Sequence, residues 1–508
     1  MLNITPLLRG RFVADALADL SVATPEAIRQ TQIEQLDRLT RCAEHTEYGR
    51  TAGIRGGMSY ADYAANAPVA EYPDIRPWVE RMLHGERDIL WPGVCRRFAQ
   101  SSGTSDGKSK YIPVTADSLR LNHYPGGSAV VSHYLRRNPQ SRLFSGKSFI
   151  LGGSFANEVR DLPRGVRVGD LSANLIEAIN PAVNLLRVPS KKIALMEDWT
   201  KKLPALARAA APQNITNISG VPSWFLTVLR EVLAITGADN IHQVWPDLEV
   251  FFHGGISFEP YRELYRSITD PERMHYVETY NASEGFFAVQ DTETPRSMLL
   301  LLRHGIFYEF APSSDPSATP VPAWEVEPGR TYSMLISAPN GLWRYAIGDV
   351  VRIDTVAPLR ITIAGRTKAF INAFGEELMV HNADAALARA CDATGARVLN
   401  YTAAPVYTSE GSRGRHQWLI EWDVEPPCGI DAFADTLDSM LQQENSDYQA
   451  KRSGGIFLDR LSITTARPGL FDAWLASTGK LGGQRKVPRL SNSRDTIESM
   501  LALNSRRQ

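Results

Sequence analysis

The stretch FAQSSGTSDGKSKYIPVT, from Phe98 to Thr115, contains a loop rich in glycine and serine followed by a β-prone segment. Three motifs overlap in it: the G-x-S-x-G of a hydrolase, a near match to a nucleotide-binding P-loop, and an S-x-x-K sequence. The first two require a helix directly after the loop, because the helix N-terminus supplies hydrogen-bond donors to the bound group. Lys110 to Val114 includes Pro113, which would break a helix, so we expect two strands joined as a hairpin.

Each motif also lacks a second feature that it requires. Ser102 stands where a P-loop needs a glycine. A hydrolase serine at Ser105 would follow an HGGG-type element, but the nearest match, His253-Gly254-Gly255, comes after it in the chain, and no clear K-T-G or S-D-N motif accompanies the S-x-x-K. Two interpretations of the loop remain: a phosphate-binding loop of N–H groups, hydroxyls and lysines, or a solvated hairpin turn.

The composition indicates a globular protein of two or three domains. The chain has 508 residues, of which 43% are hydrophobic and 22% charged. Its 55 Lys and Arg balance 56 Asp and Glu, so we expect no nucleic-acid partner. No apolar run is long enough to span a membrane and no signal-peptide pattern is present, so we expect no membrane association and a cytoplasmic location. The cysteines lack the spacing of a zinc site or a disulfide framework: Cys42, Cys95, Cys391 and Cys428.

The pattern of apolar residues changes near residue 365. Before it, short apolar runs such as LEVFFHGG and YSMLISA alternate with helical patterns, which is typical of an α/β domain with buried strands. After it, ELMVHNADAALARACDATG and DAFADTLDSMLQQENSDYQAK are predicted helices, and ARVLNYTAAPVYTSE and HQWLIEWDV are predicted strands. We therefore predict a large N-terminal α/β domain at 1–365 and a small C-terminal α+β domain at 366–508.

Three further stretches follow the opening loop in the order ETYNASEGFF, GLWRYAIGDVV and AGRTKAFINAFGEEL. Together with that loop they resemble the motifs of the adenylate-forming superfamily, and more closely those of its Gretchen Hagen auxin-responsive family of acyl acid–amido synthetases. A fifth motif, GQRKVPRL around Lys486, extends the resemblance into the C-terminal part. The resemblance implies a two-domain adenylate-forming fold, with ATP and an acyl acid bound by the large domain and a mobile small domain.

The resemblance also assigns roles in binding ATP. Tyr280 corresponds to the aromatic residue that stacks on adenine, Ser283 to the hydroxyl near the α-phosphate, and Glu284 to the Mg²⁺ ligand. Asp349 corresponds to the carboxylate that accepts from the ribose hydroxyls, and Arg366 to a cation near the nucleotide. The phosphate loop corresponds to Ser101, Ser102, Gly103, Thr104, Ser105 and Lys110, with Lys110 preferred to Lys108.

The remaining assignments concern catalysis, the hinge and the acid. Lys486 corresponds to the catalytic lysine that reaches the carboxylate and the α-phosphate, beside Ser105 and Lys110, and Lys368 lies at or beside the hinge. Acyl-binding positions implied by the resemblance are the turn His253, Gly254 and Gly255 and a helix with Trp224, Phe225 and Val228. For the three helical residues the alternative is core packing, since aromatic residues on an amphipathic helix usually face a core.

Two positions depart from the family pattern. Asp106 places a negative charge in the phosphate loop, which is tolerable if it faces solvent or pairs with Lys108. Many relatives carry an arginine where this chain has Ala346, which leaves Arg344 as the nearest cation for nucleotide contact.

The chemistry fits these residue types. A carboxylate condenses with an amine only after activation, here as a mixed anhydride with AMP as the leaving group. Mg²⁺ typically takes one or two carboxylates plus phosphate oxygens, so Glu284 alone is enough. We predict an ATP-dependent ligase, a monomer, that adenylates a small-molecule carboxylic acid and transfers the acyl group to an amino acid. The alternatives are an acyl-CoA ligase, a serine acyl-hydrolase using Ser105, and an inactive nucleotide-binding module.

Overall fold

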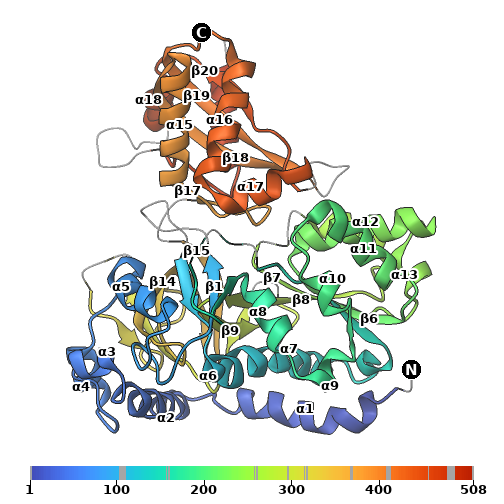
Figure 1. Ribbon diagram of the computed structural model, residues 1–508, viewed down its shortest axis with the longest axis vertical. Helices are drawn as coiled ribbons and strands as arrows, with labels where there is room; N and C mark the ends of the chain where they lie inside the picture. Colours follow the sequence, from blue (N-terminus) through green and yellow to red (C-terminus); the bar gives the residue numbers. More distant parts are fainter. Residues whose placement is uncertain are drawn as a thin grey trace.

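The computed structural model shows a large domain and a small domain, the small one standing above the large one (Figure 1). This arrangement confirms the predicted large α/β and small α+β domains, while the boundary after residue 365 stays a prediction. The structure describes residues 3–101, 110–155, 157, 159, 161–256, 258, 261–294, 297–313, 315, 318–366, 370–407, 413–455, 457–477 and 487–505.

A 12-stranded sheet organises the large domain, in the order β12-β11-β13-β14-β15-β10-β9-β8-β7-β6-β3-β5. One part is parallel and consists of β3 (Lys147–Ile150), β5 (Arg187–Val188), β6 (Ile215–Gly220), β7 (Val250–Gly254) and β8 (His275–Ala282). The other part is antiparallel and consists of β9 (Gly285–Val289), β10 (Met298–Leu300), β11 (Phe307–Pro312), β12 (Val321–Pro322), β13 (Thr331–Ala338), β14 (Leu342–Val356) and β15 (Leu359–Arg366). The change from parallel to antiparallel pairing occurs between β8 and β9.

Helices cover both faces of the parallel part, because alternate residues of each strand point to opposite faces. Phe251 of β7 belongs to a core with α11 (Trp199–Ala210), α12 (Pro222–Thr236) and α14 (Arg262–Ile268), whereas its neighbour Phe252 belongs to a core with α7 (Tyr124–Arg137). The other helices of the large domain are α1 (Thr5–Leu20), α2 (Pro25–Ala43), α3 (Glu47–Thr51), α4 (Tyr60–Asn66), α5 (Tyr72–Leu83), α6 (Ala116–Ser118), α8 (Leu171–Ala178), α9 (Pro181–Asn184), α10 (Lys191–Ala194) and α13 (Ile241–Val244).

The predicted strand hairpin around the glycine-rich loop is confirmed. β1 (Arg97–Ser101) pairs antiparallel with β2 (Lys110–Pro113), and Ser101 lies opposite Lys110. On its other edge β1 pairs in parallel with β4 (Arg167–Gly169). The loop therefore leads into a strand, whereas a P-loop or a nucleophile elbow leads into a helix.

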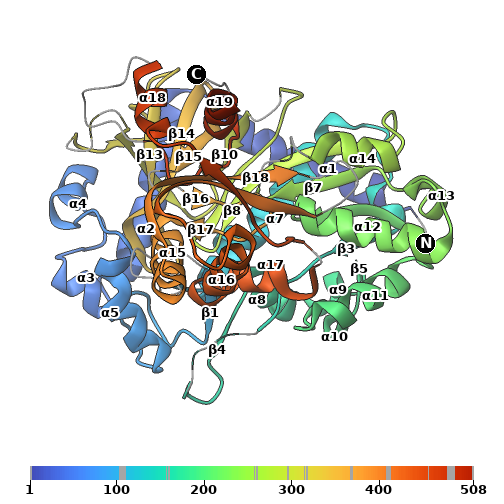
Figure 2. The ribbon, with the colours of Figure 1, turned by 90° about the horizontal axis from the view of Figure 1, so that it is seen from above.

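The small domain is a three-layer unit. Its sheet consists of β18 (Arg397–Tyr407), β19 (Gly414–Val424) and β20 (Ser462–Ala466). Helices α15 (Val380–Thr394) and α16 (Ile430–Glu444) pack on one face, and α18 (Leu470–Ser477) and α19 (Asp495–Ser505) on the other. The domain also contains α17 (Ser446–Arg452) and a short hairpin of β16 (Phe370–Ile371) and β17 (Leu378–Met379). Seen from above, α15, α16 and α17 lie over the middle of the large domain (Figure 2).

Two further expectations concern cysteines and membranes. The four cysteines are free thiols. In the part of the chain that the structure describes, none of the helices has the length and apolar character needed to cross a bilayer.

Candidate active site

The candidate active site lies where the parallel strands of the large domain end, beneath the small domain. In an open α/β sheet, ligands bind outside the carboxyl ends of the strands, at the point where strand order or direction changes. Hydrogen bonds between described residues join the small domain to this edge. Asn372 Nδ2 donates to Gly255 O at 3.4 Å, Tyr261 Oη to Ala373 O at 2.7 Å, and Trp224 Nε1 to Phe374 O at 3.3 Å.

Tyr280 and Asp349, predicted to hold adenine and ribose, are brought together by the sheet. Tyr280 lies on β8 and Asp349 on β14, and the Tyr280 hydroxyl donates to Asp349 Oδ2 at 2.5 Å. Both side chains are buried, with exposures of 5% and 6%. Gly348 precedes Asp349 with φ 89°, a conformation that glycine adopts without steric cost. The pair is therefore a fixed polar site at the edge of the sheet.

Glu284 and Ser283 lie in the turn between β8 and β9, next to that pair. Glu284 is 8% exposed, and its carbonyl accepts from Asn340 Nδ2 at 3.0 Å. Among the described residues, no group of three or more His, Cys, Asp or Glu could hold a metal ion. A single carboxylate of this kind suits Mg²⁺, which keeps waters and takes phosphate oxygens as its other ligands.

The two ends of the phosphate loop are also at this edge. Lys110 Nζ lies 3.4 Å from Tyr345 Oη and about 6 Å from the ring centroids of Tyr72 and Tyr345. Ser101 Oγ donates to Glu377 Oε2 of the small domain at 3.4 Å. The backbone of Arg366 pairs with that of Asp349. Predicted site residues that lie outside the described part are Ser102, Gly103, Thr104, Ser105, Lys368, Lys486 and the side chain of Arg366.

The structure corrects the acyl-pocket prediction for two residues. Phe225 and Val228 are fully buried in the core of α12 and the parallel strands, where the Phe225 ring packs on Phe149 and Phe251. They therefore stabilise the fold and do not line a cleft. Trp224, on the same helix, instead faces the small domain.

The predicted acyl-binding residues His253, Gly254 and Gly255 lie at the carboxyl end of β7 and directly after it. A Cβ on Gly254 would meet Thr279 O at 2.5 Å, so β7 and β8 approach as closely there as only glycine permits, and Gly255 has φ 84°. The His253 ring stacks on Phe258 at 4.3 Å, and burial lowers its pKa to about 3. His253 is therefore neutral at physiological pH and packs within the large domain.

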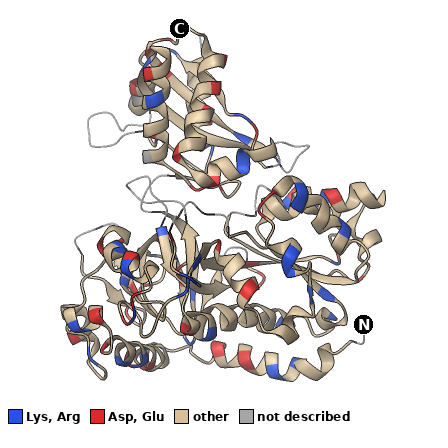
Figure 3. Cartoon of the chain, in the orientation of Figure 1, with Lys and Arg blue, Asp and Glu red and all other residues tan. Residues whose placement is uncertain are grey.

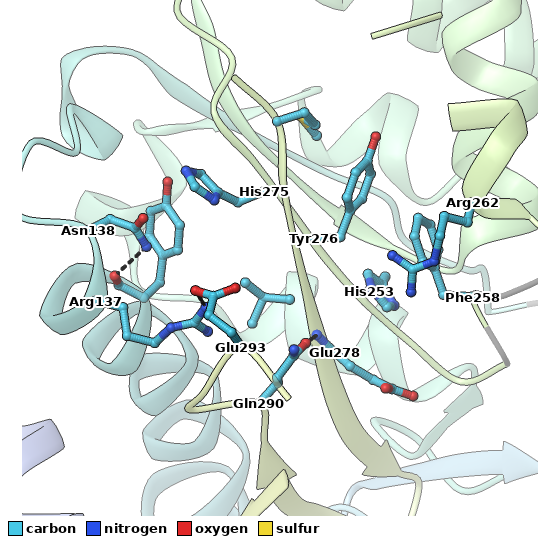
Figure 4. Close-up of a pocket in the computed structure, with 13 residues that line it drawn as sticks. Arg137, Asn138, His253, Phe258, Arg262, His275, Tyr276, Glu278, Gln290 and Glu293 are labelled. Carbon is cyan, nitrogen blue, oxygen red and sulfur yellow. Dashed lines mark hydrogen bonds and ion pairs between the residues drawn. The ribbon is translucent and has the colours of Figure 1, made fainter. Parts of the chain in front are cut away.

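A cavity of about 220 Å³ lies beside the first half of β8 (Figure 4). His253, Phe258 and Arg262 line one side, and Arg137 of α7, which pairs with Glu293, lines the other. His275 and Tyr280 are five residues apart on β8, about 16 Å at 3.3 Å per residue. Glu278, at the other end of the cavity, is two residues from Tyr280, and the cavity is smaller than most ligand pockets.

Arg344, the cation nearest to Ala346 in the sequence, is paired within the large domain. Its Nε and Nη2 donate to the Glu309 carboxylate at 2.9 Å, and its Nη1 donates to the carbonyls of Ala64 and Ala67. The two charged side chains are 6% and 1% exposed. In the described part of both domains, Lys and Arg are interspersed with Asp and Glu (Figure 3).

Sequence reasoning missed an aromatic cluster between the domains. Lys451 Nζ of the small domain lies 3.8 Å from the Trp224 ring centroid, and the Phe457 ring lies 4.9 Å from Trp199. Burial lowers the pKa of Lys451. No sequence pattern indicates this cluster, because its members come from different helices and from both domains.

Family profiles cover most of the chain: the GH3 family N-terminal domain at 21–274, the central domain at 299–366 and the C-terminal domain at 381–495. The protein belongs to the GH3 family. It is similar to indole-3-acetic acid-amido synthetase GH3.15 of Arabidopsis thaliana, with 33% identity over 94% of this chain and 92% of the relative. It is also similar to indole-3-acetic acid-amido synthetase GH3.8 of Oryza sativa subsp. indica, with 24% identity over 87% of this chain and 85% of the relative.

Solved structures confirm the adenylate-forming fold of this GH3 protein. The GH3.15 acyl acid amido synthetase matches with a TM-score of 0.59, at 19% identity in that comparison, over 96% of this chain and 95% of the other. A 2-hydroxyisobutyryl-CoA ligase in complex with 2-HIB-AMP and CoA matches with a TM-score of 0.56, at 14% identity, over 93% and 91%. Membership of the GH3 family confirms the predicted class of activity, a ligase that conjugates an acyl acid to an amino acid.

Proposed function

We propose that this GH3 protein uses ATP and Mg²⁺ to adenylate an aromatic or other acyl acid and then transfers the acyl group to an amino acid. The observation that carries the proposal is the buried Tyr280–Asp349 pair, which lies at the carboxyl edge of the sheet and beneath the docked small domain. Similar proteins are named for indole-3-acetic acid, and one solved relative is in complex with 2,4-DB, which makes these two acids the first to test.

In the proposed nucleotide site, Tyr280 presents its ring to adenine and holds the Asp349 carboxylate in the orientation that accepts from ribose hydroxyls. Ser283 and the loop from Ser101 to Lys110 donate to the phosphates. Charge-assisted bonds of this kind are stronger than neutral ones, so a lysine at the end of the loop adds to the affinity for the triphosphate.

Glu284 is the proposed ligand of Mg²⁺, which would neutralise charge on the phosphates and so lower the barrier to attack on the α-phosphorus. The acid carboxylate attacks that phosphorus, its new O–P bond forms, and the bond to pyrophosphate breaks. Lys110 and Lys486 stabilise the negative charge that develops in this step. In the second step the amine attacks the acyl carbon and AMP leaves, so the protein itself need not be acylated.

The decisive experiment is a screen of carboxylic acids, including indole-3-acetic acid and 2,4-DB, for acid-dependent exchange of pyrophosphate into ATP. Acids that support exchange are then incubated with pooled amino acids or with coenzyme A. Amide formation supports the proposal, whereas thioester formation alone would identify an acyl-CoA ligase. Glu284→Gln should lose exchange at fixed Mg²⁺, and unchanged exchange would remove the metal assignment.

Ser105→Ala distinguishes the ligase from a serine hydrolase. The variant should keep substantial amide formation, because the loop hydroxyl contributes to phosphate binding and accepts no acyl group. Complete loss, with an acyl group trapped on Ser105 of the parent protein, would favour the hydrolase. A monomeric state and a cytoplasmic location stay predictions, to be tested by light scattering and by fractionation.

A further inference from the structure

The hairpin of β16 and β17 in the small domain lies across the candidate active site. On β17's side of the turn, Glu377 Oε2 accepts from Ser101 Oγ at 3.4 Å, where the phosphate loop begins. On β16's side, opposite Glu377, Asn372 Nδ2 donates to Gly255 O at 3.4 Å, in the turn beside the proposed acyl pocket. An acyl-AMP whose phosphate lies at the first point and whose acyl group lies at the second would place its anhydride bond beneath this hairpin.

The hairpin is held in this position from both domains. Tyr261 and Trp224 of the large domain donate to the carbonyls of Ala373 and Phe374, at 2.7 and 3.3 Å. Behind the hairpin, the buried Glu376 carboxylate accepts from the Phe374 N–H at 2.6 Å and contacts His416 Nε2 at 2.8 Å. The hairpin is therefore a rigid support, which a group that faces substrate requires.

Glu377 is fixed within that support in an unusual backbone conformation. Its φ is 38°, in the left-handed region that non-glycine residues rarely adopt. Its N–H donates to Asn372 Oδ1 at 3.3 Å, and its carbonyl accepts from Asn445 Nδ2 at 3.2 Å. Strain of this kind persists where the surroundings over-determine it, and it clusters at functional sites. Its half-buried side chain is thereby directed towards the large domain.

The charge of Glu377 suits one half of the reaction better than the other. A carboxylate at the start of the phosphate loop repels the triphosphate of ATP, so this docked arrangement opposes adenylation. Once pyrophosphate has left, fewer negative charges remain, and the amino acid arrives with a cationic ammonium group. A carboxylate attracts that group, so the arrangement favours acyl transfer.

Three other described carboxylates at the site have different contacts or roles. Glu376 is fully buried against His416, and Asp349 accepts from Tyr280. Glu284 is the proposed metal ligand. Glu377 is the carboxylate that the hairpin places between the phosphate loop and the acyl turn.

We propose that Glu377 is a catalytic residue of the transfer step, which binds the ammonium group of the acceptor amino acid and removes a proton from it. This inference rests on the proposed function. The Glu377 carboxylate takes one proton from nitrogen, the freed lone pair forms the C–N bond to the acyl carbon, and the C–O bond to AMP breaks. AMP leaves with that electron pair, and the second proton of the nitrogen passes to solvent.

Four other groups set the electrostatic surroundings of Glu377. Glu376 lies beside it on the hairpin, and His416 lies behind the hairpin on β19. Lys451 faces it from α17. Lys110 lies on β2 opposite Ser101, which donates to Glu377. These groups are unchanged in the variants below, so differences in pH dependence report on Glu377.

The test compares full-length wild type, Glu377→Gln and Glu377→Asp, with the exposed Glu425→Gln, directly after β19, as a matched control. The acid is indole-3-acetic acid, or the acid that supports most exchange in the screen above. In Glu377→Gln, pyrophosphate exchange should stay within about twofold of wild type, while amide formation from accumulated acyl-AMP at pH 7 should fall about 100-fold, as expected for loss of a general base. Raising the pH should restore part of the rate, and Glu377→Asp should retain more activity than Gln.

Hydroxylamine separates proton removal from a merely structural role, because its nitrogen is largely unprotonated at neutral pH. Glu377→Gln should form the hydroxamate at nearly the wild-type rate. An equal loss with hydroxylamine and with amino acids, or amide formation at the wild-type rate, would overturn the inference. Wild type that exchanges no pyrophosphate with any acid would overturn the proposed function first, and that outcome is distinguishable because it does not involve the variant.

Discussion

Substitutions in the buried ion pair of Arg344 and Glu309 test whether Arg344 stabilises the fold or binds the nucleotide. We consider Arg344→Met, which keeps an apolar stem of similar length but removes the charge. In wild type the guanidinium donates to the Glu309 carboxylate and to the carbonyls of Ala64 and Ala67. The substitution leaves the Glu309 carboxylate, which is 1% exposed, without its cation, and leaves two carbonyls without this donor.

The expected cost follows from that burial. Breaking a buried ion pair from one side costs about 3–5 kcal/mol, because one charge remains uncompensated in a low-dielectric interior. A loss of 1 kcal/mol lowers the unfolding temperature by about 2 °C in a larger domain, so Arg344→Met should lower it by about 6–10 °C. Glu309→Leu combined with Arg344→Met should recover at least half of this loss, since replacing both partners with apolar residues is often nearly neutral.

Thermal unfolding by circular dichroism measures the stability, and ATP titration of the folded protein measures nucleotide affinity. The Kd for ATP of Arg344→Met should stay within about twofold of wild type at a temperature where both proteins are folded. Unchanged unfolding temperature together with weakened ATP binding would refute the structural assignment of Arg344. It would indicate that Arg344 contacts the nucleotide.

Two further predictions concern packing and pH. Gly126→Ala should lower the free energy of unfolding by about 1–3 kcal/mol, because its Cβ would meet Phe286 Cγ at 2.4 Å. Gly127→Ala, whose Cβ would have no atom within 4 Å, should raise the free energy of unfolding by up to about 1 kcal/mol. Denaturant titrations measure both values, and equal effects of the two substitutions would contradict the packing around Gly126. Burial holds the pKa of His253 at about 3, below its unfolded value near 6.5, so the unfolded state binds the proton first and stability falls as pH drops below about 6.5. His253→Phe should remove about 2 kcal/mol of the stability loss between pH 7.5 and 5, and parallel pH profiles for variant and wild type would exclude that cause.

Local sequence features predicted much of the fold. The proline in the segment after the glycine-rich loop predicted a strand, and β2 begins at Lys110. The apolar runs LEVFFHGG and YSMLISA predicted buried strands, and β7 and β13 are such strands. These predictions succeeded because turn chemistry and side-chain periodicity act over a few residues.

The sequence predicted the candidate site only in part, because the side to which a side chain points depends on tertiary packing. The motif order pointed to Tyr280 and Asp349, which the sheet joins across 69 residues. The same reasoning placed Phe225 in the acyl pocket, since a sequence does not say which side of an amphipathic helix meets a core and which meets a ligand. Glu377 lies in the motif AGRTKAFINAFGEEL next to Glu376, and the sequence alone does not say which of the two faces the phosphate loop.

The sequence by itself determined the family, the two-domain α/β architecture and the class of reaction, because these are encoded in short motifs and their order. The same motifs predict the nucleotide-binding positions. Only the tertiary structure decided that Arg344 forms an ion pair with Glu309, that Trp224 contacts Lys451 between the domains, and that Glu377 contacts Ser101 at the start of the phosphate loop. Each of these depends on contacts between residues far apart in the chain. Their energies come from burial and charge, which exist only once the chain has folded.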